Sequence, residues 1–139
     1  MSGETSVIIT VAPCLERFAA DAIRSALNQT VPVQVVVVLD GATAEIAAPL
    51  DRVTLHRNRE CSGNVQLARR AGLQLATGEC VLFLDADNRL PADYVAQAQQ
   101  QLRDRSLGDP RIAGIYPGIR YFDPQWKPHP RGRLRPPAW

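Results

Sequence analysis

Apolar residues along the chain follow two different spacings. Short continuous runs, rich in β-branched residues, predict strands at 7–11, 33–39, 53–55 and 81–84, with later ones at 112–115 and 119–122. Between these runs, apolar residues recur every three or four positions, which predicts helices at 15–27, 43–49, 65–76 and 91–105. Alternating strands and helices are typical of an α/β fold, with a parallel sheet and helices on both of its faces.

Local signals refine three of these elements. Gly78 is the expected C-terminal cap of the third helix, and Pro91 suits the first turn of the fourth. The run 81–84 contains four consecutive apolar residues, which is typical of a strand buried on both faces in the middle of a parallel sheet. The strand ends of such a sheet are where ligands bind.

Composition favours one globular domain. The chain has 139 residues, of which 45% are hydrophobic and 22% charged, and no apolar run approaches the ~18 residues of a membrane helix. No basic region precedes the first apolar segment, so a signal peptide is not expected. The three cysteines lack metal-ligand spacing and are expected to be free thiols in a reducing compartment, which favours a cytoplasmic location.

The net charge of +2 is unevenly distributed. Residues 124–139 carry four basic and no acidic residues, which leaves 12 basic and 14 acidic residues in 1–123. The same tail holds five prolines, so we expect a domain at 1–123 and a Pro/Arg-rich tail without regular structure at 124–139. Aromatic residues show no regular spacing among the basic ones, and nucleic-acid binding is not expected.

Two carboxylates, Asp85 and Asp87, come directly after the fourth predicted strand. Burying two unpaired carboxylates costs about several kcal/mol of free energy, unless a positively charged group lies beside them. Mg²⁺ or Mn²⁺ carrying a diphosphate would supply that charge, because these ions are held by one or two carboxylates together with phosphate oxygens. The alternative is structural, since an acid here can cap the following helix.

Further candidates follow the other strands. Asp40 ends the second strand, where an exposed carboxylate can bind a base or a ribose, although Asp-Gly is also a common turn. Ala12 and Pro13 follow the first strand, and Pro13 by itself explains why that strand stops. Arg69 could reach a diphosphate or lie on a solvated helix face. The segment 61–64 is either a phosphate-facing loop or a helix cap.

Four segments, taken in order, resemble the N-terminal half of the family 2 glycosyltransferases of GT-A type. They are VIITVAP at 7–13, SALNQT at 25–30 with VVVVLDGAT at 35–43, ARRAG at 68–72 with ATGE at 76–79, and VLFLDAD at 81–87. The resemblance covers about residues 6–105. It implies a Rossmann-like GT-A sheet whose C-terminal half lies outside this chain.

The resemblance also implies roles by position. Ala12 and Pro13 would form the base-contacting loop, and Asp40 would bind the base or ribose of a nucleotide-sugar. Arg69 would lie near the nucleotide, Asp85 would contact the ribose or sugar, and Asp87 would bind the Mg²⁺ or Mn²⁺ that bridges the diphosphate. The implied chemistry is inverting transfer of the sugar to a hydroxyl acceptor, which is a glycan, lipid or protein.

The chain departs from the family pattern at three points. A second acid or a serine usually flanks the nucleoside acid, where this chain has Leu39 and Gly41, and asparagine is usual in place of Arg70. No carboxylate follows Asp123, so the catalytic base has no candidate, and the chain alone is expected to be inactive. The alternative is a non-catalytic nucleotide-binding or interaction module from a truncated gene.

Overall fold

A computed structural model describes residues 4–43, 45–115, 117–123 and 125–134. These residues belong to two compact units, Met1–Gln97 and Ala98–Trp139. The boundary falls inside helix α3, Tyr94–Gly108. The expected domain limits of 1–123 and 124–139 remain a prediction, since compactness alone divides the chain at a different place.

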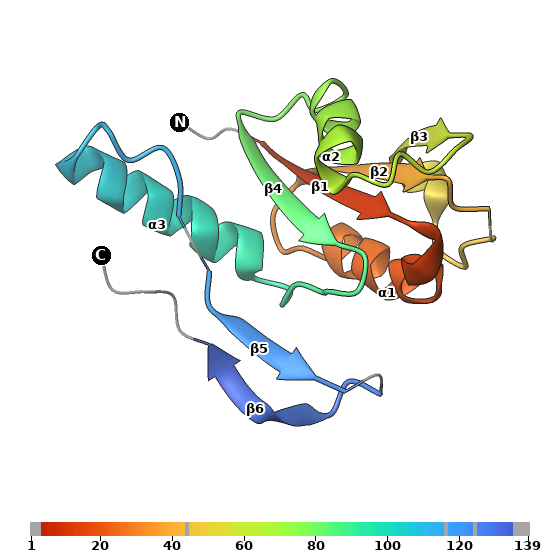
Figure 1. The fold of residues 1–139 in the computed structure, drawn as a ribbon. Helices are drawn as coiled ribbons and strands as arrows, with labels where there is room; N and C mark the ends of the chain where they lie inside the picture. The colour runs from red at the N-terminus through yellow and green to blue at the C-terminus, as the bar shows by residue number, and fades with distance from the viewer. Residues whose placement is uncertain (1–3, 44, 116, 124, 135–139) are drawn as a thin grey trace. The chain divides into compact units, whose positions relative to one another are not determined.

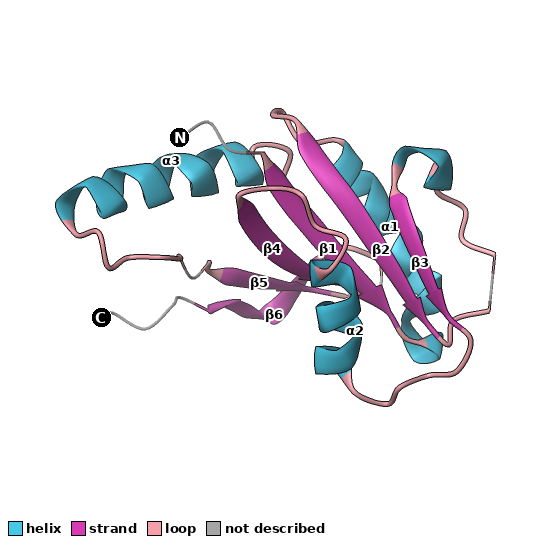
Figure 2. Ribbon diagram, turned by 90° about the horizontal axis from the view of Figure 1, so that it is seen from above, coloured by secondary structure: helices cyan, strands magenta, loops and turns pink. Residues whose placement is uncertain are grey.

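The first unit contains a four-stranded parallel sheet. Its strands are β1 (Thr5–Val11), β2 (Val33–Asp40), β3 (Thr54–Asn58) and β4 (Cys80–Asp85), in the order β3-β2-β1-β4. Helices α1 (Glu16–Leu27) and α2 (Val65–Leu73) lie on opposite faces (Figures 1 and 2). The expected α/β sheet covered on both faces is therefore confirmed. Strand order reverses between β1 and β4, and such a switch point is where open α/β sheets bind ligands.

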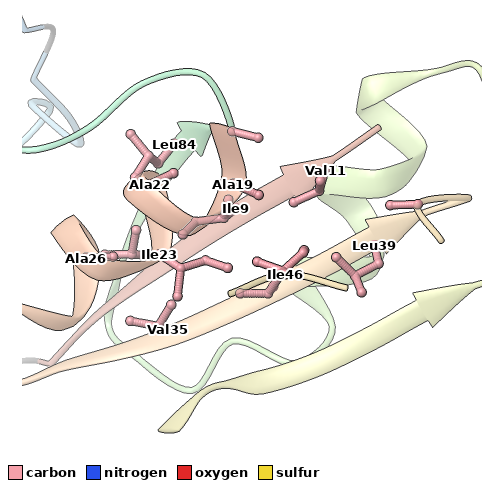
Figure 3. Close-up of a cluster of buried hydrophobic side chains, with 14 of the residues drawn as sticks. Ile9, Val11, Ala19, Ala22, Ile23, Ala26, Val35, Leu39, Ile46 and Leu84 are labelled. Atoms are coloured by element: carbon pink, nitrogen blue, oxygen red, sulfur yellow. The ribbon is translucent and has the colours of Figure 1, made fainter. Parts of the chain in front are cut away.

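The larger part of the core lies between the sheet and α1. Alternate residues of β1 and β2 point toward α1, as the two-residue repeat of a strand requires. They pack against the small residues of the helix, and Ile23 lies among them, fully buried (Figure 3). The side chains from the strands are Val7, Ile9, Val11, Val35, Val37 and Leu39. Small residues on α1 let the helix approach the branched side chains closely.

The opposite face is covered by α2. Ile8, Val36 and Val38 point toward this helix, and Ala68 meets them. Gly72 allows the close approach, since a Cβ at this position would lie 2.4 Å from Cγ2 of Ile8. The helix ends earlier than predicted, with Gln74 as its C-terminal cap.

Gly78 has a different role from the one expected. A Cβ there would lie 2.5 Å from the carbonyl oxygen of Glu4 and 2.7 Å from the backbone nitrogen of Ser6. The expectation that Gly78 caps α2 is therefore wrong, because its missing side chain instead lets the chain pass against β1.

The expected helix at 43–49 is also wrong. The described residues of this segment form a loop, followed by a single 3-10 turn, η2, at Leu50–Arg52; a similar turn, η1, at Pro13–Leu15 precedes α1. Ala42 and Ile46 are buried in the main core although they belong to a loop. Their four-residue spacing matches that of a helix, but two apolar side chains of an irregular loop can also reach the core.

Strand β4 is less buried than its sequence suggests. Val81 and Phe83 are each 40% exposed, whereas Leu84 on the other face is 5% exposed. The expectation of a central strand buried on both faces is wrong, because β4 lies at an edge of the four-stranded sheet. A continuous apolar run therefore shows that both faces of the strand are apolar. It does not show that other elements of the protein cover both faces.

The second unit contains an antiparallel pair, β5 (Ile119–Phe122) and β6 (Pro128–Leu134). The strand predicted at 119–122 is confirmed, whereas 112–115 forms no strand. The tail was expected to lack regular structure, and this is wrong for Pro128–Leu134. Proline removes a hydrogen-bond donor but is tolerated in a strand that has a partner on one side only.

Candidate functional site

A cavity of about 260 Å³ lies at the switch point of the sheet. The ends of three strands contribute Thr10 from β1, Asp40 from β2 and Asp85 from β4. Its remaining wall includes Ala12, Cys61, Asn64 and Ala68 from the loop after β1, the loop before α2 and α2 itself. Candidate site residues that lie up to 73 positions apart in sequence, from Ala12 to Asp85, thus line the same cavity.

Asp40 is the most deeply placed acid of this site, at 4% exposed. Its Oδ1 accepts from Asn58 Nδ2 at 2.9 Å, and its Oδ2 accepts from Ser62 Oγ at 2.7 Å. The backbone nitrogen of Ser62 donates to both oxygens, at 3.1 and 3.2 Å, and Cys61 Sγ lies 3.8 Å from Oδ2. The expectation of an exposed carboxylate is wrong, because three residues from β3 and the following loop surround it.

These contacts keep Asp40 ionised. Burial by itself raises the pKa of Asp40, but the hydrogen bonds from Asn58, Ser62 and Cys61 outweigh it and hold that pKa below its ordinary value of 3.8. A carboxylate oxygen accepts about two hydrogen bonds, so most of this capacity is used inside the protein. A ligand donor would have to share or displace one of these bonds.

Gly41 fixes the loop that faces Asp40. Its φ is +76°, which favours glycine, and a Cβ there would lie 2.5 Å from the backbone nitrogen of Cys61. Asp40 and Gly41 therefore form a turn, and the loop at 61–64 packs directly against Gly41. In that loop Asn64 caps α2, its Oδ1 accepting from the backbone nitrogen of Gln66 at 2.9 Å.

Asp85 forms an ion pair with Arg69 of α2. The Arg69 guanidinium lies 3.0 Å from Asp85 Oδ1, and its central carbon lies 5.2 Å from the centre of the Phe83 ring. The side chain of Asp85 is 48% exposed, so the pair contributes at most about 1 kcal/mol to stability. Arg69 does not line the cavity itself but is held next to Asp85 by a carboxylate and an aromatic face, both from β4.

Asp87 lies outside the lining of the cavity, two residues past Asp85. It is exposed, and it forms no side-chain hydrogen bond or ion pair with another described residue. Among the described residues there is no cluster of three or more His, Cys, Asp or Glu side chains that could hold a metal ion by itself. A metal here would need oxygen atoms from a ligand.

The other predicted residues divide between two places. Ala12 lines the cavity, and its carbonyl oxygen accepts from the Leu15 backbone nitrogen at 2.9 Å. Pro13 instead lines a separate, more open cavity of about 430 Å³ beside Glu16 and Glu45. Sequence reasoning missed Asn58 as a partner of Asp40, although its place at the end of β3 was a usable signal.

Comparisons with known proteins agree on the fold. The model of glycosyl transferase family 2 matches residues 6–135. The crystal structure of S. aureus TarS 1-349 is 24% identical, with a TM-score of 0.65 over 73% of this chain and 32% of that one. The structure of TarS 1-349 with UDP matches at 24% identity with a TM-score of 0.65, over 73% of this chain and 32% of that one. The structure with UDP-GlcNAc matches at 24% identity with a TM-score of 0.64, over 73% of this chain and 31% of that one.

The chain thus spans about a third of the TarS 1-349 structures it matches. No curated protein matches it. No helix among the described residues has both the length and the apolar character needed to cross a membrane. The resemblance read from the four sequence segments is confirmed by the family match, which extends over nearly the whole chain. The chain belongs to glycosyl transferase family 2.

Proposed function

We propose that the cavity at the switch point binds the nucleotide of a uridine-diphosphate sugar, and that Asp87 binds a divalent metal on its diphosphate. The observation that carries the proposal is the convergence of Ala12, Asp40 and Asp85 on one cavity. The TarS structures with UDP and UDP-GlcNAc, which share this fold, support the choice of nucleotide.

The nucleoside end of the ligand would lie between the loop after β1 and Asp40. Asp40 is ionised and held in one orientation by Asn58 and Ser62, so it could accept from a base N–H or a ribose hydroxyl by sharing or displacing one of these hydrogen bonds. Ala12 lines the same cavity and would offer its backbone to the base. Pro13 does not line this cavity and lies instead at the start of η1.

The diphosphate end would lie toward Asp85 and Asp87. The donor set fits Mg²⁺ or Mn²⁺, because Asp87 is exposed, is not paired with any described side chain, and can serve as the single protein ligand beside phosphate oxygens and water. When bound, such an ion stabilises negative charge on a departing diphosphate. Arg69, already oriented by Asp85, would donate to the ribose side or to the phosphates.

The reaction supported by this arrangement is transfer of a sugar from the nucleotide to a hydroxyl acceptor with inversion. The described residues provide the donor side: Asp40 orients the nucleoside, and Asp85 and Asp87 lie at the diphosphate end. A general base would have to remove the acceptor proton, and the described residues offer no candidate for it at the cavity. The acceptor, whether glycan, lipid or protein, is left open.

Calorimetry with UDP tests the proposal. Wild type should bind UDP more tightly with Mn²⁺ than without it, and Asp87→Asn should remove most of that gain while leaving uridine binding unchanged. Asp51→Asn, which neutralises an exposed acid on η2 outside the cavity, serves as the matched control. An Asp87→Asn chain that keeps the full Mn²⁺ effect would contradict the metal assignment.

The nucleoside site has an independent readout. Cys61 lines the cavity and is exposed, whereas Cys14 is exposed elsewhere. UDP should slow alkylation of Cys61 by iodoacetamide and leave that of Cys14 unchanged, as followed by peptide mass spectrometry. Equal protection of the two thiols, or of neither, would place the nucleotide elsewhere.

A further inference from the structure

The segment after Asp87 is fastened to the end of helix α1. Four hydrogen bonds join residues 90–95 to residues 25–30, more than 60 positions apart in sequence. The Leu90 backbone nitrogen donates to Ser25 Oγ at 3.1 Å, and the Thr30 backbone nitrogen donates to the Ala92 carbonyl oxygen at 2.8 Å. The remaining two bonds involve the side chain of Gln29.

Gln29 uses both ends of its amide in this contact. Its Nε2 donates to the Pro91 carbonyl oxygen at 2.8 Å, and its Oε1 accepts from the Val95 backbone nitrogen at 2.9 Å. Val95 lies in the first turn of α3, where backbone N–H groups have no partner within the helix. Nε2 also donates to the Ser25 carbonyl oxygen at 3.0 Å, which fixes the orientation of the amide. Gln29 therefore caps α3 from the loop that follows α1.

The turn that carries Asp87 is consequently held from both sides. On one side Asp85 belongs to β4, paired in register with Thr10, and Ala86 is fully buried. On the other side the chain is fixed at Leu90 and Pro91. The Asn88 backbone nitrogen closes the turn by donating to the Asp85 carbonyl oxygen at 2.9 Å. Only two residues, 88 and 89, separate Asp87 from the first anchored position.

From this geometry we infer that Gln29, assisted by Ser25, is a positioning residue for Asp87. The inference rests on the proposed function, since it assigns Gln29 a part in the metal-dependent binding of the diphosphate. A single exposed carboxylate holds a metal well only when its backbone is fixed, and loss of supporting hydrogen bonds around metal ligands typically lowers metal affinity about 10–100-fold. Gln29 does not line the nucleoside cavity, so the affinity for uridine should not depend on it.

The test compares two affinities in the full chain. Gln29→Met keeps the length of the side chain and removes both polar groups. Calorimetry should show that the Mn²⁺-dependent gain in UDP affinity falls about tenfold or more, while uridine without metal binds as before. Hydrogen exchange at residues 86–92 should accelerate. Gln100→Ala is the matched control, because that glutamine is exposed and bonds only within its own helix.

A second variant covers the case in which Gln29→Met does not fold. Ser25→Ala removes the acceptor of the Leu90 backbone nitrogen, together with the bond that the hydroxyl donates to the Ala22 carbonyl oxygen within α1, and should reduce the Mn²⁺-dependent gain in the same direction, by a smaller factor. If the Mn²⁺-dependent gain in UDP affinity is unchanged in every variant that folds, the role of Gln29 is wrong. It is also wrong if uridine and UDP lose affinity equally. A wild-type chain with no Mn²⁺-dependent gain would instead contradict the proposed function itself.

Discussion

Asp40 has a structural role in addition to the binding role proposed for it. It was recognisable in the sequence because it ends a strong strand and precedes a glycine. Its surroundings were less recognisable: Asn58, 18 positions away, could be inferred only from its place at the end of a strand, and Ser62, 22 positions away in a loop, follows no periodic spacing. A buried carboxylate with these partners contributes to folding stability, so it is more than a surface ligand group.

The stabilisation from Asp40 should depend on pH. The folded-state pKa lies below the ordinary 3.8, so the contribution is complete well above pH 4 and is lost as the pH falls through the lowered folded value. At pH 7, Asp40→Asn should lower the free energy of unfolding by about 1–3 kcal/mol, the usual loss for a charged hydrogen-bond partner. Urea titrations should show this difference shrinking below pH 4. A difference that stays constant with pH, or a similar one in Asp51→Asn, would argue against this account.

At the scale of elements, the distance between α2 and β1 is set by a residue without a side chain. Gly72 brings the helix against Ile8 and so places Arg69 beside Asp85. Long, strongly periodic elements such as α1 were predictable, because their spacing reports the face that is buried. The segments 43–49 and 112–115 were not, since a few apolar residues are compatible with either a loop or a regular element.

Gly72→Ala should therefore destabilise the protein. The added Cβ would lie 2.4 Å from Ile8 Cγ2 and 3.3 Å from Val38 Cγ2, which forces α2 away from the sheet or Ile8 into a poorer rotamer. The expected loss is about 1–3 kcal/mol, typical of overpacking. Gly108→Ala is the control, because no atom lies within 4 Å of its added Cβ. Equal midpoints for both variants in thermal unfolding would show that the helix can shift without cost.

At the scale of the whole molecule, β4 presents apolar side chains to solvent. Val81 and Phe83 are adjacent on one face of this strand, each 40% exposed. Exposed apolar residues on an edge strand favour association between chains. Strand order could not be derived from the pattern of apolar runs, because the same run suits a central or an edge position.

We expect Val81→Lys to reduce self-association. Sedimentation velocity over a range of protein concentrations should show less of the larger species than in wild type, since a charge on an edge strand opposes pairing. Leu107→Lys is a suitable control, because Leu107 is 87% exposed on α3 and lies apart from β4 in sequence. Association that persists unchanged in Val81→Lys would exclude this face as its cause.

Donor binding and sugar transfer should separate in this chain. In the proposed function Asp40, Asp85 and Asp87 serve the donor, and the described residues offer no assigned base or acceptor wall at the cavity. Positioning of reactants can contribute about 7–11 kcal/mol to lowering a barrier, and a general base a further 10²–10⁴-fold in rate. The chain should therefore bind UDP-sugars with Mn²⁺ and release no transfer product with hydroxyl acceptors. Multiple turnovers in a product assay would show that a base has been overlooked.

The sequence by itself determined the order of the main strands and helices along the chain, and it indicated acids at the ends of two strands as candidates, Asp40 after one and Asp85 and Asp87 after the other. Both follow from local rules, the two-residue and 3.6-residue repeats and the position of polar residues after apolar runs. Tertiary structure alone decided that Asp40 is surrounded by Asn58 and Ser62, that β4 lies at an edge, and that Gln29 holds the segment after Asp87. These features depend on hydrogen bonds and packing between residues far apart in the chain, which leave no repeating pattern in the order of amino acids.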